Sequence, residues 1–307
     1  MGAGKAAAVG VACGALAGWL YLAAGFGTMG ALVLVYMTEL PLFVAGLWFG
    51  AGAAAVAGLT GAVVLLAASD LLGAAIFAAM NAVPVALLVR QALLARRRSD
   101  DTLAWYPPGL LTAWLAALAL GGIAASLALH GGAAGLQAAL RNMVAEILDA
   151  IALPANADRA VVIDTIAAII PGVVAASWMV TTIVNGALAQ GVLARFGANW
   201  RPSPDLATLG LPLWLPAALG LAGVAATFGG TPRYIGLNAA IALVVPFCLA
   251  GLAVVHAAAR RLPHPAVGLV CFYTVAALFG WPFLLVAVLG LLESWLGLRR
   301  RLLPLES

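Results

Sequence analysis

Charged residues are scarce in this chain of 307 residues, at 8% against 65% hydrophobic residues. Soluble globular domains carry about 25% charged residues, so this chain lacks the side chains needed to cover a water-facing surface. Its net charge of +4 comes mainly from short arginine clusters beside apolar runs, and it gives no indication of nucleic-acid binding. The composition indicates an integral membrane protein in contact with the lipid bilayer.

The usual sequence patterns of catalysis, metal binding and disulfide formation are missing. Cys13, Cys248 and Cys271 lie singly in apolar runs, and the three histidines are equally scattered. The segment Gly2-Ala3-Gly4-Lys5 does not have the spacing of a phosphate-binding loop, and Ala6 stands where that loop needs Ser or Thr. We therefore expect no enzyme activity, no cofactor, no metal and no ATP hydrolysis by the chain itself.

Long apolar runs dominate what is present, and a spanning helix needs about 20 mainly apolar residues. The sequence predicts an all-α, polytopic membrane helical bundle that forms a single integral membrane domain over residues 1–307. Eight spans and a C-terminal helical hairpin are expected. They are Ala6–Phe26, Ala31–Phe49, Ala51–Ala68, Leu71–Leu94, Gly109–Leu129, Ile166–Leu193, Leu209–Phe228 and Gly236–Ala258, followed by Ala266–Leu298.

Basic residues predict the orientation of these spans, because cytoplasmic loops are enriched in Lys and Arg. With alternating spans, 12 of the 15 basic residues fall on one side. Both termini are then cytoplasmic, in the cytoplasmic (inner) membrane of a bacterium. The block 266–298 must return to the side it left, so we expect a hairpin that turns near Trp281-Pro282.

A carboxylate in the middle of the second span is the leading candidate for function. Glu39 follows Thr38 and stands two residues before Pro41, which cannot donate a backbone hydrogen bond and so frees a carbonyl around Met37. A charged side chain at this depth costs about 2.5–3.5 kcal/mol on insertion scales. Glu39 and Thr38 are therefore predicted to bind a cation or an amine-bearing solute, and Asn81 before Pro84 repeats the arrangement in the fourth span.

Polar side chains in the sixth span add to this prediction. Ser177, Thr181 and Asn185 are spaced by four residues, so they share one helix face. Together with Glu39 and Asn81 they predict a polar solute site at mid-membrane. The alternative is that these side chains only form hydrogen bonds that hold the helices together. Two acids lie elsewhere: Asp70 at a turn is expected to be solvated or to cap a helix, and Glu293 to pair with Arg299.

Glycines at four-residue steps mark the first span. Gly10, Gly14 and Gly18 form a ridge that allows close approach of another helix. This ridge is predicted to contact a membrane partner subunit or a moving helix. Packing inside the chain's own bundle is the alternative, and the third span, with Gly50, Ala54, Gly58 and Ala62, has a similar ridge.

The segment 130–164 is the longest one outside the predicted spans, on the extracytoplasmic side. Its apolar residues recur at steps of three and four, as in an amphipathic helix: Leu136, Leu140, Met143, Ile147 and Ile151. Such a helix can lie in the membrane interface over a cavity mouth. The alternative is a helix packed on the bundle.

Two sequence segments resemble a known family. The run from Leu40 to Gly50, LPLFVAGLWFG, and the ending from Leu289 to Trp295, LGLLESW, followed by three arginines, are similar to the YybS-like bacterial membrane proteins (domain of unknown function 2232). A family-like ending has Asp where this chain has Glu293. Residues 1–194 also resemble the six-span S components of energy-coupling-factor vitamin transporters, and residues 209–301 are additional to that pattern.

These features lead to two main hypotheses. The first is a solute-binding or transport component without its own ATPase, with an unidentified small solute at the predicted site. The second is a non-transporting scaffold or assembly factor that packs against partner helices. An intramembrane enzyme acting on lipid is a third, but Glu39 has no His, Cys or second acid near it in the sequence.

Overall fold

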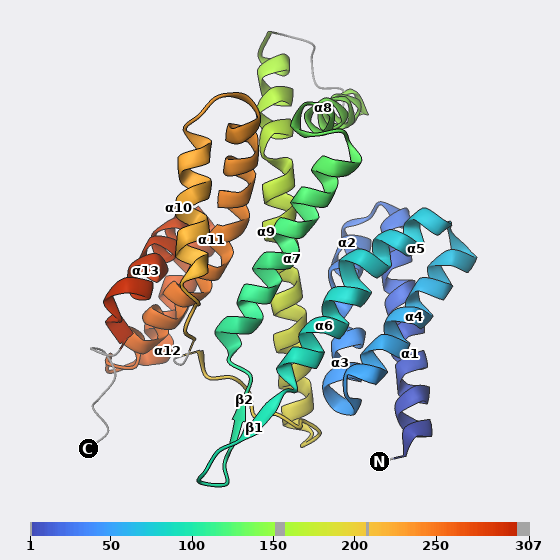
Figure 1. Cartoon of the computed structure of the whole chain (residues 1–307), viewed down its shortest axis with the longest axis vertical. Coiled ribbons are helices and arrows are strands. Elements are labelled where there is room, and N and C mark those ends of the chain that lie inside the picture. The colour runs from blue at the N-terminus through green and yellow to red at the C-terminus, as the bar shows by residue number, and fades with distance from the viewer. Residues whose placement is uncertain (1, 151–156, 207–208, 300–307) are drawn as a thin grey trace. The chain divides into compact units, whose positions relative to one another are not determined.

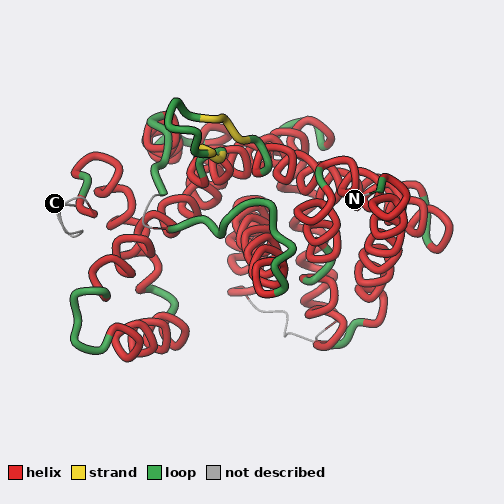
Figure 2. The backbone as a smooth tube through the Cα atoms, turned by 90° about the horizontal axis from the view of Figure 1, so that it is seen from below, coloured by secondary structure: helices red, strands yellow, loops and turns green. Residues whose placement is uncertain are grey.

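The structure is a computed structural model that describes residues 2–150, 157–206 and 209–299, and it is built almost entirely of helices (Figures 1 and 2). This confirms the predicted all-α membrane bundle. The predictions for Ile151, Arg300 and Arg301 lie outside the described residues.

Two compact units share the chain. Unit 1 comprises Met1–Leu111 and Val180–Asp205, and unit 2 comprises Thr112–Met179 and Leu206–Ser307. The long helix α9 (Ala157–Arg195) contributes its first part to unit 2 and its last part to unit 1. This division does not coincide with the predicted one between residues 1–194 and 209–301.

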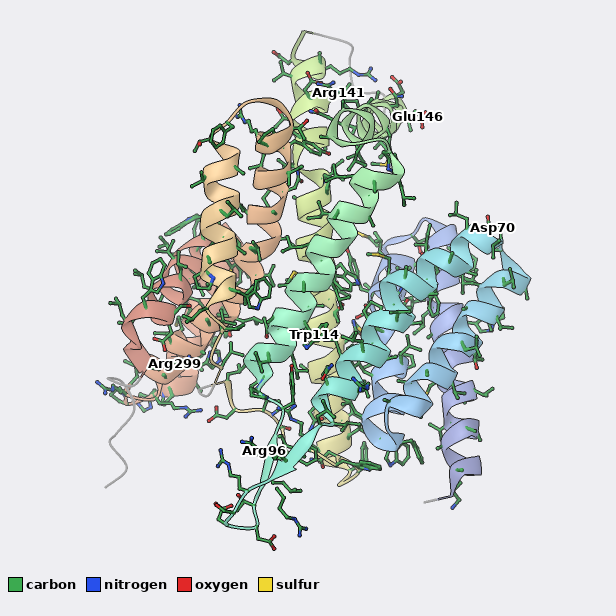
Figure 3. The ribbon with its side chains drawn as sticks, viewed as in Figure 1. Asp70, Arg96, Trp114, Arg141, Glu146 and Arg299 are labelled. Atoms are coloured by element: carbon green, nitrogen blue, oxygen red, sulfur yellow. The ribbon has the colours of Figure 1, made fainter. Side chains whose placement is uncertain are left out.

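Unit 1 contains the first four spans, a β-hairpin and the end of α9. Its elements are α1 (Ala3–Leu22), η1 (Ala23–Phe26), α2 (Met29–Tyr36), α3 (Glu39–Phe49), α4 (Ala51–Ala68), α5 (Leu71–Phe77), η2 (Ala78–Ala82), α6 (Val83–Ala92), β1 (Ala95–Arg97) and β2 (Leu103–Trp105). The strands β1 and β2 pair antiparallel, with Arg96 opposite Ala104. Figure 3 labels Arg96 on this hairpin, which carries the arginine cluster of the loop.

Small residues set the packing of α1 on α4. A Cβ added at Gly14 would overlap the carbonyl oxygen of Ala57, and one at Gly18 would lie 2.9 Å from the side chain of Val64. Real Cβ atoms do not approach this closely, so the two helices meet only because these positions have no side chain. The glycine ridge of the first span is therefore filled by α4 of the same unit. The alternative of internal packing holds, and the prediction that Gly10, Gly14 and Gly18 form a partner interface is wrong in this structure.

Unit 2 contains the other helices, with α11 packed against α10 and α13. Its elements are α7 (Pro108–Leu129), α8 (Ala133–Ala150), the first part of α9, α10 (Trp214–Ala226), α11 (Gly230–Ala259), α12 (Pro265–Phe279) and α13 (Pro282–Leu296). Gly251 and Gly290 allow the contact of α11 with α13, because a Cβ on either would overlap a backbone carbonyl of the other helix.

A buried asparagine joins α11 to α9 within unit 2. Oδ1 of Asn238 accepts a hydrogen bond from the N–H of Gly172 at 2.7 Å, and its Nδ2 donates to the carbonyl of Ala168 at 2.9 Å. In a regular helix this N–H and this carbonyl bond to each other. The side-chain amide is thus inserted into the hydrogen-bond ladder of α9, directly after Pro171. Sequence reasoning missed Asn238 because nothing local distinguishes it.

Seven helices in the described part of the chain are long and apolar enough to cross a membrane. They correspond to the predicted spans one to six and eight. The predicted seventh span, 209–228, is only partly helical, since α10 has 13 residues. Pro212 and Pro216 explain the shortening: proline fits the first turn of a helix but not its interior, so the helix begins at Trp214.

The C-terminal helices form the predicted hairpin. The α12 and α13 axes are bent by 118° at Gly280-Trp281, where Gly280 has a φ of +69°. Each helix has 15 residues, about 22 Å at 1.5 Å per residue, which is shorter than the hydrocarbon core of about 30 Å. The side on which the termini lie stays a prediction from the basic residues.

The amphipathic segment forms α8, with a buried face that differs in part from the predicted one. Leu136 packs with Ala133 and Tyr234 of α11, and Leu140 is packed against this cluster. Met143 and Ile147 are exposed. The buried stripe follows Val144 and Leu148 instead. Residue spacing fixed the helix, but contacts with α11 fixed its rotation.

Candidate functional site

The second span is broken in its middle, as its proline predicts. α2 ends at Tyr36 and α3 begins at Glu39, with Pro41 in the first turn of α3, where the missing N–H costs nothing. The N–H of Leu40 bonds to the carbonyl of Met37 instead of reaching back to Tyr36. The carbonyl released from the helix ladder is therefore that of Tyr36, one residue before the expected position.

Glu39 is buried at this break. It is the first residue of α3 and only 2% exposed. The N-terminal end of a helix carries a partial positive charge, so its first turn stabilises a carboxylate. Oγ1 of Thr182, on α9, donates a hydrogen bond to Oε1 of Glu39 at 3.1 Å. The break thus holds an acid between two separate segments of unit 1.

Asn185 joins α9 to the same break. Its Nδ2 donates to the released carbonyl of Tyr36 at 2.7 Å and to the carbonyl of Thr181, one turn earlier on α9, at 2.9 Å. Glu39 and Asn185 are therefore brought together at one place, as predicted. Thr182 completes the set; it lies three residues before Asn185, on the same face of α9.

Two oxygen atoms in this cluster are buried and make no hydrogen bond within the described residues. They are Oγ1 of Thr38 and Oδ1 of Asn185, on side chains that are 1% and 0% exposed. Burying a polar group without a partner costs about 1–3 kcal/mol in proteins. Such groups cluster where a ligand supplies the missing contact.

The charge of the cluster follows from the sequence. The apolar segments 6–26, 31–49, 51–68, 71–89 and 180–194 of unit 1 contain Glu39 as their one acid and no Lys, Arg or His. The site therefore presents a single negative charge and several oxygen atoms at the centre of a 21-residue span. This arrangement can bind one positive charge.

The remaining predicted residues lie differently. Asn81 is half-buried in η2, a π-helical turn directly before Pro84, and such turns are frequent at functional sites. No contact joins Asn81 to Glu39 in the interactions described. Ser177 is exposed and belongs to unit 2. Thr181 contributes its carbonyl, not its side chain.

Two acids outside the site behave as expected. Oδ1 of Asp70 accepts from the N–H of Gly73 at 2.6 Å and so caps α5. Oε1 of Glu293 accepts from Nε of Arg299 at 2.8 Å, and both side chains are buried. Arg299, labelled in Figure 3, also donates to the carbonyl of Leu206. This ion pair fastens the end of α13 to the segment before α10.

Arg201 has a structural role that its position in the sequence does not indicate. It is buried, and its Nη1 donates to the carbonyl of Ala92 at the end of α6 at 3.0 Å. Burial lowers the pKa of the Arg201 guanidinium. Gln190 of α9 donates to the carbonyl of Arg201. The loop after α9 is thereby held against α6 within unit 1.

Comparison with known proteins identifies a family but no activity. Among the described residues, no group of three or more His, Cys, Asp or Glu could hold a metal ion. No curated protein and no solved structure matches the chain, so the resemblance to S components stays a prediction. A family model described as a predicted membrane protein, DUF2232, matches residues 15–294. The chain therefore belongs to the DUF2232 family of multi-pass membrane proteins, as the resemblance in its sequence indicated.

Proposed function

We propose that this chain is a membrane-embedded solute-binding or transport component without its own ATPase or other catalytic activity. The observation that carries the proposal is the buried carboxylate of Glu39 at a helix break, bonded to Thr182 and next to unsatisfied oxygens. In transporters, discontinuous helices at mid-membrane supply the groups that bind substrates and coupling ions. The proposal places the chain in a bacterial cytoplasmic membrane with both termini on the cytoplasmic side.

The proposal does not include a partner on the glycine ridge, because α4 occupies that ridge. It includes a small solute, whose path through the membrane passes the break between α2 and α3. Energy then comes from an ion gradient or from a partner that binds elsewhere.

Retention and uptake of solute test this proposal. The full chain is purified in mild detergent, small molecules that remain bound are identified by mass spectrometry, and their uptake is measured in proteoliposomes. We expect one solute class to be retained and taken up by the wild type and lost in Glu39→Gln, a replacement of nearly equal shape. Ser177→Ala, an exposed polar position on the same long helix, serves as the control and keeps both activities.

A folded wild type that retains and transports nothing, in the presence of each candidate ion gradient, overturns the proposal. Co-purification of a stoichiometric membrane partner would then favour the scaffold. The exposed arginines of the β1–β2 hairpin are the observation in favour of that second function, because clusters of this kind bind anionic lipid or acidic protein surfaces.

A further inference from the structure

We infer that the break in the second span is a binding site for one small monovalent metal cation, with Na⁺ as the probe. Its ligands are the carboxylate of Glu39, Oγ1 of Thr38 and Oδ1 of Asn185. This inference rests on the proposed function and names the ion coupled to it.

The oxygen atoms identify the chemistry of the ligand. Oγ1 of Thr38 and Oδ1 of Asn185 are fully buried and accept no hydrogen bond from the described residues. Carboxylate, hydroxyl and amide oxygens are the ligands that hard metal cations prefer. A cation among them satisfies both orphaned oxygens at once, which no single hydrogen-bond donor of the chain does here.

The charge of the site fixes the valence. Glu39 is the one acid in the apolar segments of unit 1, and these segments contain no basic side chain. A monovalent ion forms a neutral pair with it, whereas a divalent ion leaves a net charge buried at low dielectric, which is costly. The C-terminal end of α2, whose dipole is negative, meets the break and also favours a cation.

Burial limits the size of the ligand. Thr38, Glu39 and Asn185 are 1%, 2% and 0% exposed. These oxygens are therefore enclosed by the surrounding helices in this conformation, which suits a dehydrated ion better than an ammonium group that carries the rest of a solute. The solute of the proposed function binds elsewhere along the path or in another conformation.

Thr38→Val gives the sharpest test. Oγ1 of Thr38 makes no hydrogen bond in the described structure, so valine of similar shape removes an ion ligand without breaking a contact of the fold. We expect this variant to be as stable as the wild type in Na⁺-free buffer. Its half-saturating Na⁺ concentration should rise about tenfold, as expected for one lost ligand contact.

The measurements are thermal unfolding of the detergent-purified full chain and binding of ²²Na⁺, both in NaCl against choline chloride of equal ionic strength. We expect Na⁺ to raise the melting temperature of the wild type with saturation, and one ²²Na⁺ to bind per chain. Glu39→Gln should lose both effects. Thr181→Val, adjacent to Thr182 on α9 but contributing only its carbonyl, is the matched control and should keep both.

Equal melting temperatures of the wild type in the two salts, with no ²²Na⁺ bound, overturn the inference, as does a Na⁺ effect that survives in Glu39→Gln. Stabilisation by alkylammonium ions alone would assign the site to an amine instead. The two proposals fail separately. Solute uptake that is independent of Na⁺ refutes the ion site and leaves transport standing, whereas Na⁺ binding without any uptake refutes transport and leaves the ion site.

Discussion

Replacement of Asn238 by leucine tests how the amide inserted in α9 supports unit 2. Leucine has the same branching at Cγ as asparagine, so it fills the same place but forms no hydrogen bond. The N–H of Gly172 and the carbonyl of Ala168 both lose the partners that Asn238 supplies. The leucine side chain keeps them apart, so the ladder of α9 cannot close again.

The expected cost follows from these two backbone groups. A buried unsatisfied group costs about 1–3 kcal/mol, whereas interhelical hydrogen bonds measured in membrane proteins average about 0.6 kcal/mol. Two groups, partly relaxed within the bundle, give an expected loss of about 2 kcal/mol in the free energy of unfolding. Tyr234 adds little to this loss, because its carbonyl still accepts the backbone N–H of residue 238 in the helix.

Unfolding by titration with SDS in mixed micelles, followed by tryptophan fluorescence, measures this loss. Asn142→Leu, at an exposed position on α8 of the same unit, is the control and should change the free energy by less than about 0.5 kcal/mol. If Asn238→Leu is as mild as this control, the amide is not a structural element of α9. Faster hydrogen exchange at Gly172 in the variant would confirm the mechanism directly.

Three further predictions rest on contacts described above. Gly14→Val should prevent folding of unit 1, whereas Gly4→Val, where an added Cβ meets no atom within 4 Å, should be tolerated; similar yields of monodisperse protein on size-exclusion chromatography would refute the tight α1–α4 contact. Glu293→Gln removes the carboxylate that faces buried Arg299 and should cost about 3–5 kcal/mol; an unchanged SDS midpoint would contradict this. Arg201→Gln should increase hydrogen exchange at the end of α6, and protection equal to that of the wild type would show that this contact is dispensable.

Hydropathy predicted most of the fold because the length of an apolar run is a local property of the sequence. The spans one to six, the eighth span and the C-terminal turn at Gly280 all follow from it. Pro41 and Pro84 likewise marked the irregular turns, because the lost N–H acts on the proline's own helix. The seventh span failed where Pro212 and Pro216 outweighed the apolar character of residues 209–228.

Contacts between helices were less predictable. The rotation of α9 decides that Thr182, not Ser177, accompanies Asn185, and spacing along one helix carries no information about this choice. The glycine ridge was recognised as a site of close approach, but its sequence does not tell whether a partner or α4 fills it. Asn238 and Arg201 bond to backbone groups far along the chain, so no local pattern announces them.

The separation of 143 residues between Glu39 and Thr182 has a consequence for biosynthesis. Ribosomes add about 5–20 residues per second, so the acid enters the membrane roughly 7–30 s before the threonine that bonds to it has been made. During this interval the nascent second span must keep its carboxyl group in lipid, in the translocation machinery or beside water. Segments whose partners arrive so late are natural clients of membrane-insertion chaperones, and crosslinking of stalled nascent chains at Glu39 would reveal which of these shelters it.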